Sequence, residues 1–194
     1  MTVTPEKINR FWLDEVGPEG WYEQSAALDR TCRDRFMDAW IDAPRLAKEW
    51  AGTAEGALAA LILTDQFPRN MFRDDARAFS TDPLARRIAD QAIAAGFDLA
   101  TGEPARQFFY MPYEHSEELA DQERAVALFA ERMPGESLVH ARAHRDTIAR
   151  FGRFPWRNAA LGRTPTAAET AVMEAGGYGA VVSGKLKLAD LPEC

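Results

Sequence analysis

Long apolar runs are missing from this sequence of 194 residues. A membrane-spanning helix needs about 18 or more consecutive apolar residues. The longest near-candidate, residues 57–63, is about a third of such a span. The chain begins MTVTPEK, which lacks the basic segment and apolar run of a secretory signal peptide. We therefore expect neither a transmembrane segment nor a signal peptide.

Cysteine is also scarce, since only Cys32 and Cys194 occur. Two cysteines in these positions match neither a disulfide framework nor a metal-binding spacing. Cys32 lies on the apolar stripe of an expected helix, where a thiol is usually inert core. We expect a protein of the reducing cytoplasm.

Positive charge is outnumbered by negative charge, with 23 lysines and arginines against 30 acidic residues and a net charge of −7. An acidic surface repels phosphate backbones and anionic membranes alike. The composition therefore predicts no nucleic acid and no membrane as a partner.

Period-two alternation of apolar residues is absent, whereas spacings of three and four residues recur along the whole chain. This pattern predicts an all-α fold of about eight or nine helices. Helix-start residues support it at Thr4, Thr53 and Thr166, the last within a capping box. The expected helices cover residues 5–16, 25–41, 44–50, 54–65, 82–95, 103–110, 117–132, 137–151 and 166–175.

Proline follows a bulky apolar residue at three expected helix ends, which are spaced 44 and 43 residues apart. The pairs are Phe67-Pro68, Met111-Pro112 and Phe154-Pro155. Each interval holds about two helices, as in helical-repeat arrays. We expect diverged antiparallel hairpins, and chance spacing of prolines is the alternative.

The Gly-Gly-Tyr-Gly segment at 176–179 follows a helix, so it predicts a helix stop and a flexible tail. A phosphate-binding loop would precede a helix, so we expect no such loop and no other cofactor site.

Charges of opposite sign separate along the second half of the chain. Residues 114–123 contain five acids and no base, whereas residues 140–163 contain six arginines and one acid, Asp146. Antiparallel packing of the two helices that carry them predicts an internal salt-bridge network. The alternative is that surplus guanidinium groups bind a carboxylate or phosphate.

Histidine is rare, and two of the three histidines, His140 and His144, stand four residues apart on an expected helix. Such a pair can share a metal ion, but the Glu that follows the first His in metalloproteases is missing, so we expect no metal. A structural role is favoured instead, in which each His donates to a backbone carbonyl or a carboxylate. His115 could act as a base oriented by Glu114 or Glu118, or it could hold a loop in place. Ser116 is explained as a helix cap and not as a nucleophile.

Three polar segments, together with the stretches that follow them, resemble one family. They are DQFPRN at 65–70, the run from 109 to 117, and the run from 144 to 155. They resemble the largely bacterial family named domain of unknown function 924, and the likeness covers about residues 5–180. The resemblance implies a helical array similar to tetratricopeptide (TPR) repeats, an α/α superhelix, with no established activity. Members of the family typically carry histidine where this chain has Trp156. We expect one domain over residues 1–194, with residues 181–194 as a C-terminal tail.

Three hypotheses of function follow. In the first, the protein binds a small anionic ligand or peptide in a concavity lined by Asp65, Arg69, Asn70, His115, Glu117, His144, Arg145 and Arg153. In the second, it is a hydrolase or lyase in which His115 or His144 transfers a proton and Glu114 or Asp146 orients it. In the third, it is a scaffold whose polar motifs only hold helices together.

Overall fold

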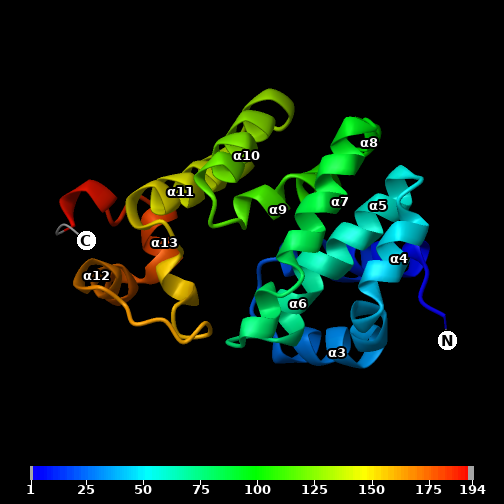
Figure 1. Ribbon diagram of the computed structural model, residues 1–194, viewed down its shortest axis with the longest axis horizontal. Helices are drawn as coiled ribbons and strands as arrows, with labels where there is room; N and C mark the ends of the chain where they lie inside the picture. The colour runs from blue at the N-terminus through cyan, green and yellow to red at the C-terminus, as the bar shows by residue number, and fades with distance from the viewer. Residues whose placement is uncertain (1, 192–194) are drawn as a thin grey trace. The chain divides into compact units, whose positions relative to one another are not determined.

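The computed structural model describes residues 2–191, and these contain helices and no β-strand (Figure 1). The expected all-α class is confirmed. Cys194, for which no disulfide was expected, lies outside the described residues. The chain divides into two compact units, Met1–Pro112 and Tyr113–Cys194. The expectation of one domain over 1–194 stays a prediction.

The first unit contains α1 to α8 and most of the short helical turns. The α-helices are α1 (Pro5–Asn9), α2 (Gly17–Gly20), α3 (Ala26–Ile41), α4 (Ala43–Trp50), α5 (Ala54–Leu61), α6 (Phe67–Met71), α7 (Asp82–Ala94) and α8 (Phe97–Ala100). Two π-helical turns, Arg10–Val16 and Ile62–Gln66, extend α1 and α5, and 3-10 turns cover Ala76–Phe79 and Ala105–Phe109. Helix α9 (Met111–Glu114) contains the boundary between the units.

The core of the first unit is aromatic and centres on Phe67, which is fully buried. Its ring lies 4.6 Å from that of Phe36, 5.6 Å from that of Trp12 and 5.9 Å from that of Phe11. Helix α5 packs against α1, α4 and α7, and its residues Gly56–Leu61 are all buried. A helix with apolar residues on nearly all sides needs such neighbours on both faces.

The Phe67-Pro68 pair does not end a helix, which corrects the sequence-based boundary at about residue 65. The chain remains helical from Ala54 to Met71, because α5 continues through the π-helical turn Ile62–Gln66 into α6. Proline has no N–H to donate and its ring clashes with the preceding turn of a regular α-helix. The wider π turn before Pro68 relieves this conflict. Pro112 and Pro155 likewise lie in the first turn of a helical segment.

The second unit is built on the hairpin of α10 (Leu119–Arg132) and α11 (Glu136–Phe151), which pack along each other after a short turn (Figure 1). A 3-10 turn (Pro155–Arg157), α12 (Ala167–Ala175), α13 (Gly177–Val182) and a last 3-10 turn (Leu188–Asp190) follow. The hairpin agrees with the expected antiparallel pairing. Helix α13 corrects the flexible tail expected after Gly176, since Gly177 and Ala180 are buried.

Two of the expected caps are present, since Thr53 accepts from the N–H of Gly56 and Thr166 forms the capping box with Glu169. The expected cap at Thr4 is wrong, because its side chain makes no cap hydrogen bond, although the helix does begin at Pro5. Ser25, which was not expected as a cap, accepts from the N–H of Leu28. Ser116 differs from the expectation, because α10 begins only at Leu119. Its hydroxyl accepts instead from the N–H of Glu118, in the turn before the helix.

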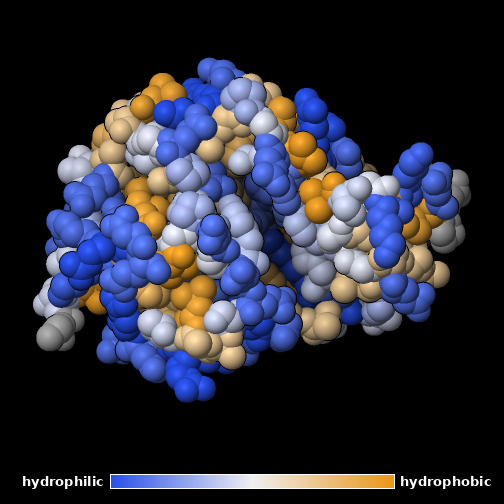
Figure 2. Space-filling view, turned by 180° about the vertical axis from the view of Figure 1, so that it is seen from behind, coloured by the Kyte–Doolittle hydropathy of each residue, from blue (hydrophilic) through white to orange (hydrophobic). Residues whose placement is uncertain are grey.

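The surface carries no continuous apolar area on the face shown in Figure 2, where hydrophobic residues form small groups between hydrophilic ones. Large exposed apolar side chains come from separate helices, for example Ile41, Leu99 and Val139. Within residues 2–191, every helix falls short of the length or the apolar character that crossing a bilayer requires.

Candidate functional site

The residues predicted to form a site are divided between the two units. Asp65, Arg69 and Asn70 belong to the first unit, and Glu114, His115, Glu117, His144, Arg145, Asp146 and Arg153 belong to the second. The idea that all of them line one concavity stays a prediction. Within each unit the contacts are defined, and they differ in kind.

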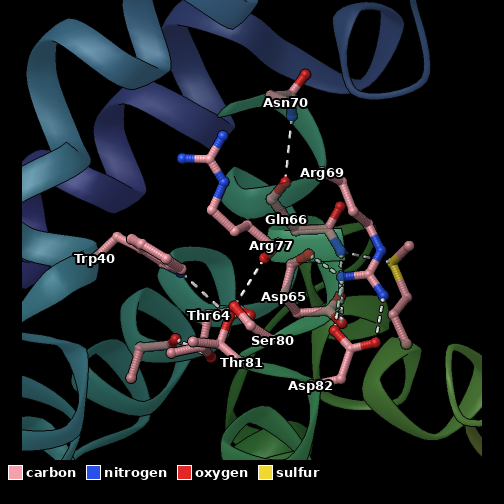
Figure 3. A network of polar contacts seen from close by, with 12 residues as sticks. Trp40, Thr64, Asp65, Gln66, Arg69, Asn70, Arg77, Ser80, Thr81 and Asp82 are labelled. Carbon is pink, nitrogen blue, oxygen red and sulfur yellow. Dashed lines mark hydrogen bonds and ion pairs between the residues drawn. The ribbon is translucent and has the colours of Figure 1, made fainter. Parts of the chain in front are cut away.

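In the first unit, Arg69 is enclosed by acceptors (Figure 3). Its two terminal nitrogens each donate to one oxygen of Asp82 at 3.0 Å, and one of them also donates to the carbonyl of Asp65 at 2.5 Å. The Asp65 carboxylate lies 3.3 Å away and is 1% exposed. Burial lowers the pKa of the Arg69 guanidinium, but Asp65 and Asp82 outweigh this and hold the net pKa above its usual range.

The neighbouring polar groups of this network also bond inward (Figure 3). Gln66 donates to the other Asp65 oxygen at 2.5 Å, and Asn70 donates to the carbonyl of Gln66 at 3.3 Å. The hydroxyl of Thr81 donates to the carbonyl of Thr64 at 2.6 Å. These bonds join the π-helical turn Ile62–Gln66 to the start of α7, so the DQFPRN motif serves to hold helices together.

In the second unit, all three histidines of the chain gather around one carboxylate. We call Glu114, His115, His140, His144 and Tyr178 the histidine cluster. Glu114 ends α9, His115 follows it, and His140 and His144 lie one turn apart on α11. Tyr178 comes from α13. The histidine rings are each partly exposed, whereas Glu114 is 5% exposed.

The central contact of the histidine cluster is between Glu114 and His144. Oε1 of Glu114 lies 2.8 Å from Nδ1 of His144, which is also 3.0 Å from the carbonyl oxygen of His140. Both neighbours are acceptors, so Nδ1 carries the proton and the lone pair of the neutral ring is on Nε2. This arrangement orients an imidazole for proton transfer at Nε2.

The Glu114 carboxyl is held in its ionised form. Burial raises its pKa, but the charge and hydrogen bond of His144, with the charges of His115 and His140, outweigh burial and bring the net pKa below its usual range. A charged carboxylate therefore faces His144 at neutral pH. This is the electrostatic partner that a protonated imidazole requires.

Aromatic rings surround the other sides of His144. The ring centroid of Tyr178 lies 4.6 Å away, that of Phe154 5.4 Å away and that of Trp156 6.1 Å away. Trp156 also stacks on Phe154 at 5.0 Å. Trp156, which stands where the resembled family has histidine, is thus an apolar wall beside His144. Such walls lower the local dielectric constant and so strengthen the electrostatic contact between His144 and Glu114.

Several arginines of the second unit pair with acidic residues. Arg163 donates to both oxygens of Glu117 at 2.9 and 2.7 Å, and Arg153 donates to both oxygens of Glu169 at 2.6 and 2.8 Å. The Arg153 guanidinium, with help from the Thr166 backbone, brings the pKa of Glu169 to about 2. The expected internal salt-bridge network is confirmed.

More exposed pairs complete this network. Arg145 donates to Asp146 at 2.6 Å and to Glu123 at 3.3 Å. Asp146 thus faces a guanidinium, and Glu114 is the acid that contacts a histidine. Of the two orienting acids considered from sequence, the geometry favours Glu114.

Tyr178 is the member of the cluster that sequence reasoning missed. Its hydroxyl forms a short hydrogen bond with Nδ1 of His140. A tyrosine between two glycines, away from any apolar periodicity, is the available signal, but these glycines predict a tail. From sequence, His140 is expected as half of a metal pair or as a structural residue that donates to a carbonyl or carboxylate. In the part of the chain that the structure describes, no group of three or more His, Cys, Asp or Glu is placed to hold a metal ion.

Two further polar candidates are closed off. The Cys32 side chain is fully buried, and burial raises the pKa of its thiol to about 12, which agrees with an inert core cysteine. Ser116 is 2% exposed and its oxygen accepts from a backbone N–H. Neither is placed as a nucleophile.

Comparison with known proteins gives the relatives of this chain. Residues 8–177 match the family described as "Bacterial protein of unknown function (DUF924)". A solved structure of a protein of unknown function from Agrobacterium tumefaciens is 45% identical, with a TM-score of 0.84 over 89% of this chain and 97% of that one. Among curated proteins, none matches the sequence. The chain belongs to the DUF924 family of bacterial proteins of unknown function.

Proposed function

We propose that the histidine cluster is an acid–base centre in which His144 accepts a proton at Nε2 and Glu114 orients it. The observation that carries the proposal is the 2.8 Å contact between a buried carboxylate and Nδ1 of His144. A carboxylate in this position fixes the tautomer and stabilises the imidazolium that forms. The supported class is a hydrolase or lyase of small molecules.

Water is the nucleophile that fits a hydrolytic version of this proposal. Ser116 and Cys32 are buried and otherwise engaged, as described above. An imidazole with its lone pair on Nε2 can take a proton from water, which then attacks an ester or a related carbonyl. Placement of a general base contributes about 10²–10⁴-fold to such a reaction.

The test is hydrolysis of p-nitrophenyl esters of graded acyl length by the purified full chain. His144→Gln is expected to lower kcat/KM at least about 100-fold, and Glu114→Gln about 10-fold or more. Glu123→Gln, an exposed carboxylate on α10, is the matched control and should leave the rate unchanged. Circular dichroism verifies folding of each variant. Turnover that His144→Gln retains, or no turnover above the uncatalysed rate, would contradict the proposal.

Binding of a small anion is the second candidate. The favouring observation is that one buried carboxylate, Glu114, lies among three histidines, of which His144 contacts it and His115 and His140 act on it through their charge, so that cationic rings would outnumber the acid. Arg145, which is 30% exposed and paired with exposed acids, could turn to such a ligand, whereas Arg153 would first have to leave Glu169. Inorganic phosphate and acetate, in place of a peptide carboxylate, are the probes.

A thermal-shift titration distinguishes this candidate. Phosphate or acetate should raise the melting temperature more at pH 5.5 than at pH 8, and Arg145→Ala should reduce the rise. A rise of equal size at both pH values would count against binding at the histidines.

With a net charge of −7, we further propose a cytoplasmic location and small-molecule partners, with neither nucleic acid nor membrane. The TPR-like array is retained as a proposal.

A further inference from the structure

A second proton-transfer group lies beside His144 and comes from a different helix. The Tyr178 ring packs on the His144 ring with centroids 4.6 Å apart, and its hydroxyl hydrogen-bonds Nδ1 of His140. Because His140 is one turn before His144 on α11, the phenol and the imidazole lie next to each other. A small substrate that touches one of them is within reach of the other.

We propose that Tyr178 is the proton donor that complements His144, and that His140 is the positioning residue for its hydroxyl. The inference rests on the proposed acid–base function and names the second half of it. A site that both removes and supplies protons needs two titratable groups in different environments. His144 faces a carboxylate, whereas Tyr178 faces an imidazole.

The hydrogen bond to His140 suits this role. A neutral imidazole either accepts from the phenol or donates to its oxygen, depending on its tautomer. With the proton on Nδ1, His140 donates to Oη, and the proton of Oη is directed away from His140. The same N–H then stabilises the phenolate that remains after the proton has been given up.

The hydrolytic step balances with these groups alone. Nε2 of His144 takes a proton from water as the water oxygen bonds to the carbonyl carbon of an ester. The bond from that carbon to the alcohol oxygen breaks, and the alcohol oxygen takes the proton from Oη of Tyr178. The imidazolium then returns one proton to the phenolate through solvent, so the products are a carboxylic acid and an alcohol.

Leaving-group dependence separates this role from a structural one. An alkoxide leaving group needs a proton, whereas p-nitrophenolate leaves without one. Tyr178→Phe should therefore lower kcat for an ethyl ester about 100-fold or more. The p-nitrophenyl ester of the same acid should stay within about twofold, because its cleavage needs no proton donor. His140→Gln should follow the same pattern more weakly, and Tyr22→Phe, an exposed tyrosine in the first unit, is the control.

The outcomes are distinguishable. Loss of both activities in His144→Gln with loss of only the ethyl ester in Tyr178→Phe supports the assignment. Equal loss of both substrates in Tyr178→Phe shows a packing role, and no loss shows no role; either result overturns the inference while the proposed function of His144 stands.

A chemical probe tests the Tyr178–His140 pair without any turnover. N-acetylimidazole acetylates phenols, and the sites are located by mass spectrometry. The N–H of His140 that donates to Oη stabilises the phenolate, which is the attacking species in this acetylation. His140→Gln should therefore slow acetylation of Tyr178 at least about fivefold and leave that of Tyr22 unchanged. Equal rates at Tyr178 in both proteins would overturn the role of His140, even if no ester were hydrolysed.

Discussion

The polar network of the first unit and the histidine cluster of the second use similar ingredients in opposite ways. In the first, the guanidinium of Arg69 is bound by the buried acids Asp65 and Asp82. Their described neighbours in this network are amide and hydroxyl side chains, which do not titrate near neutral pH. In the second, a buried acid faces an imidazole. A permanent cation fixes a structure, whereas an imidazole can gain and lose its charge. Polar motifs of similar composition therefore differ in this chain, one pairing a fixed cation and the other a group that titrates.

The largest expected effect is in the first unit. Arg69→Ala leaves Asp65 and Asp82 buried without their cation, and we expect a loss of about 3–5 kcal/mol in the free energy of unfolding. Urea unfolding measures it. Arg77→Ala removes an exposed arginine with a single acidic neighbour, Asp75, and should leave the unfolding midpoint unchanged. A similar midpoint for both variants would show that burial does not distinguish the two arginines.

Glu114→Gln comes second and should cost about 1.5–3 kcal/mol at pH 7, because a charged hydrogen bond to His144 is lost. The native pKa of Glu114 lies below the ordinary 4.5. The stability that its charge provides is therefore fully present above pH 4.5 and is lost as the pH falls through the lower native value. Urea unfolding at pH 7 and at pH 3 should show the gap between wild type and variant closing. A gap that does not change with pH would exclude the charge as its cause.

Glu169→Gln is expected to cost less, about 1–2 kcal/mol, since one backbone bond of the capping box can remain. The native pKa of about 2 against an ordinary 4.5 places its acid-sensitive range between these values. The contribution is present above pH 4.5 and is lost as the pH approaches 2. The variant lacks this titrating group, so the difference in stability between wild type and variant should shrink as the pH falls from 4.5 to 2. Acid unfolding of both proteins, followed by circular dichroism, measures this difference. Parallel acid transitions would refute the assignment.

Arg145→Ala should have the smallest effect, below about 1 kcal/mol, because its partners Asp146 and Glu123 are more than half exposed. Added salt should reduce even this difference. Stability measured at low and high ionic strength provides the comparison. A loss as large as that of Glu114→Gln would place Arg145 among the structural pairs.

Much of the fold followed from local rules. The caps at Thr53 and Thr166 depend on residues a few positions apart, which a sequence displays directly. The pairing of acids at 114–123 with arginines at 140–163 followed from a hairpin. In each of these interactions, a short sequence pattern is enough to identify the partners.

The parts that sequence did not predict depend on geometry that no short pattern carries. Continuation of the helix past Pro68 requires a π-helical turn, and periodicity of 3.6 residues does not predict such a turn. The contact of Tyr178 with His140 joins residues 38 positions apart through the packing of α13. Glycines on both sides of Tyr178 pointed to flexibility, but Gly177 and Ala180 are buried.

The π-helical turn at Ile62–Gln66 sets the angular position of everything that follows it. Each residue of an α-helix rotates its successors by about 100° around the axis. Deleting one residue from 62–66 would give a more regular helix, yet it would swing the Phe67 ring out of its aromatic neighbours and Arg69 away from Asp82. The length of this one turn is therefore a constraint on insertions and deletions that residue identity alone does not reveal.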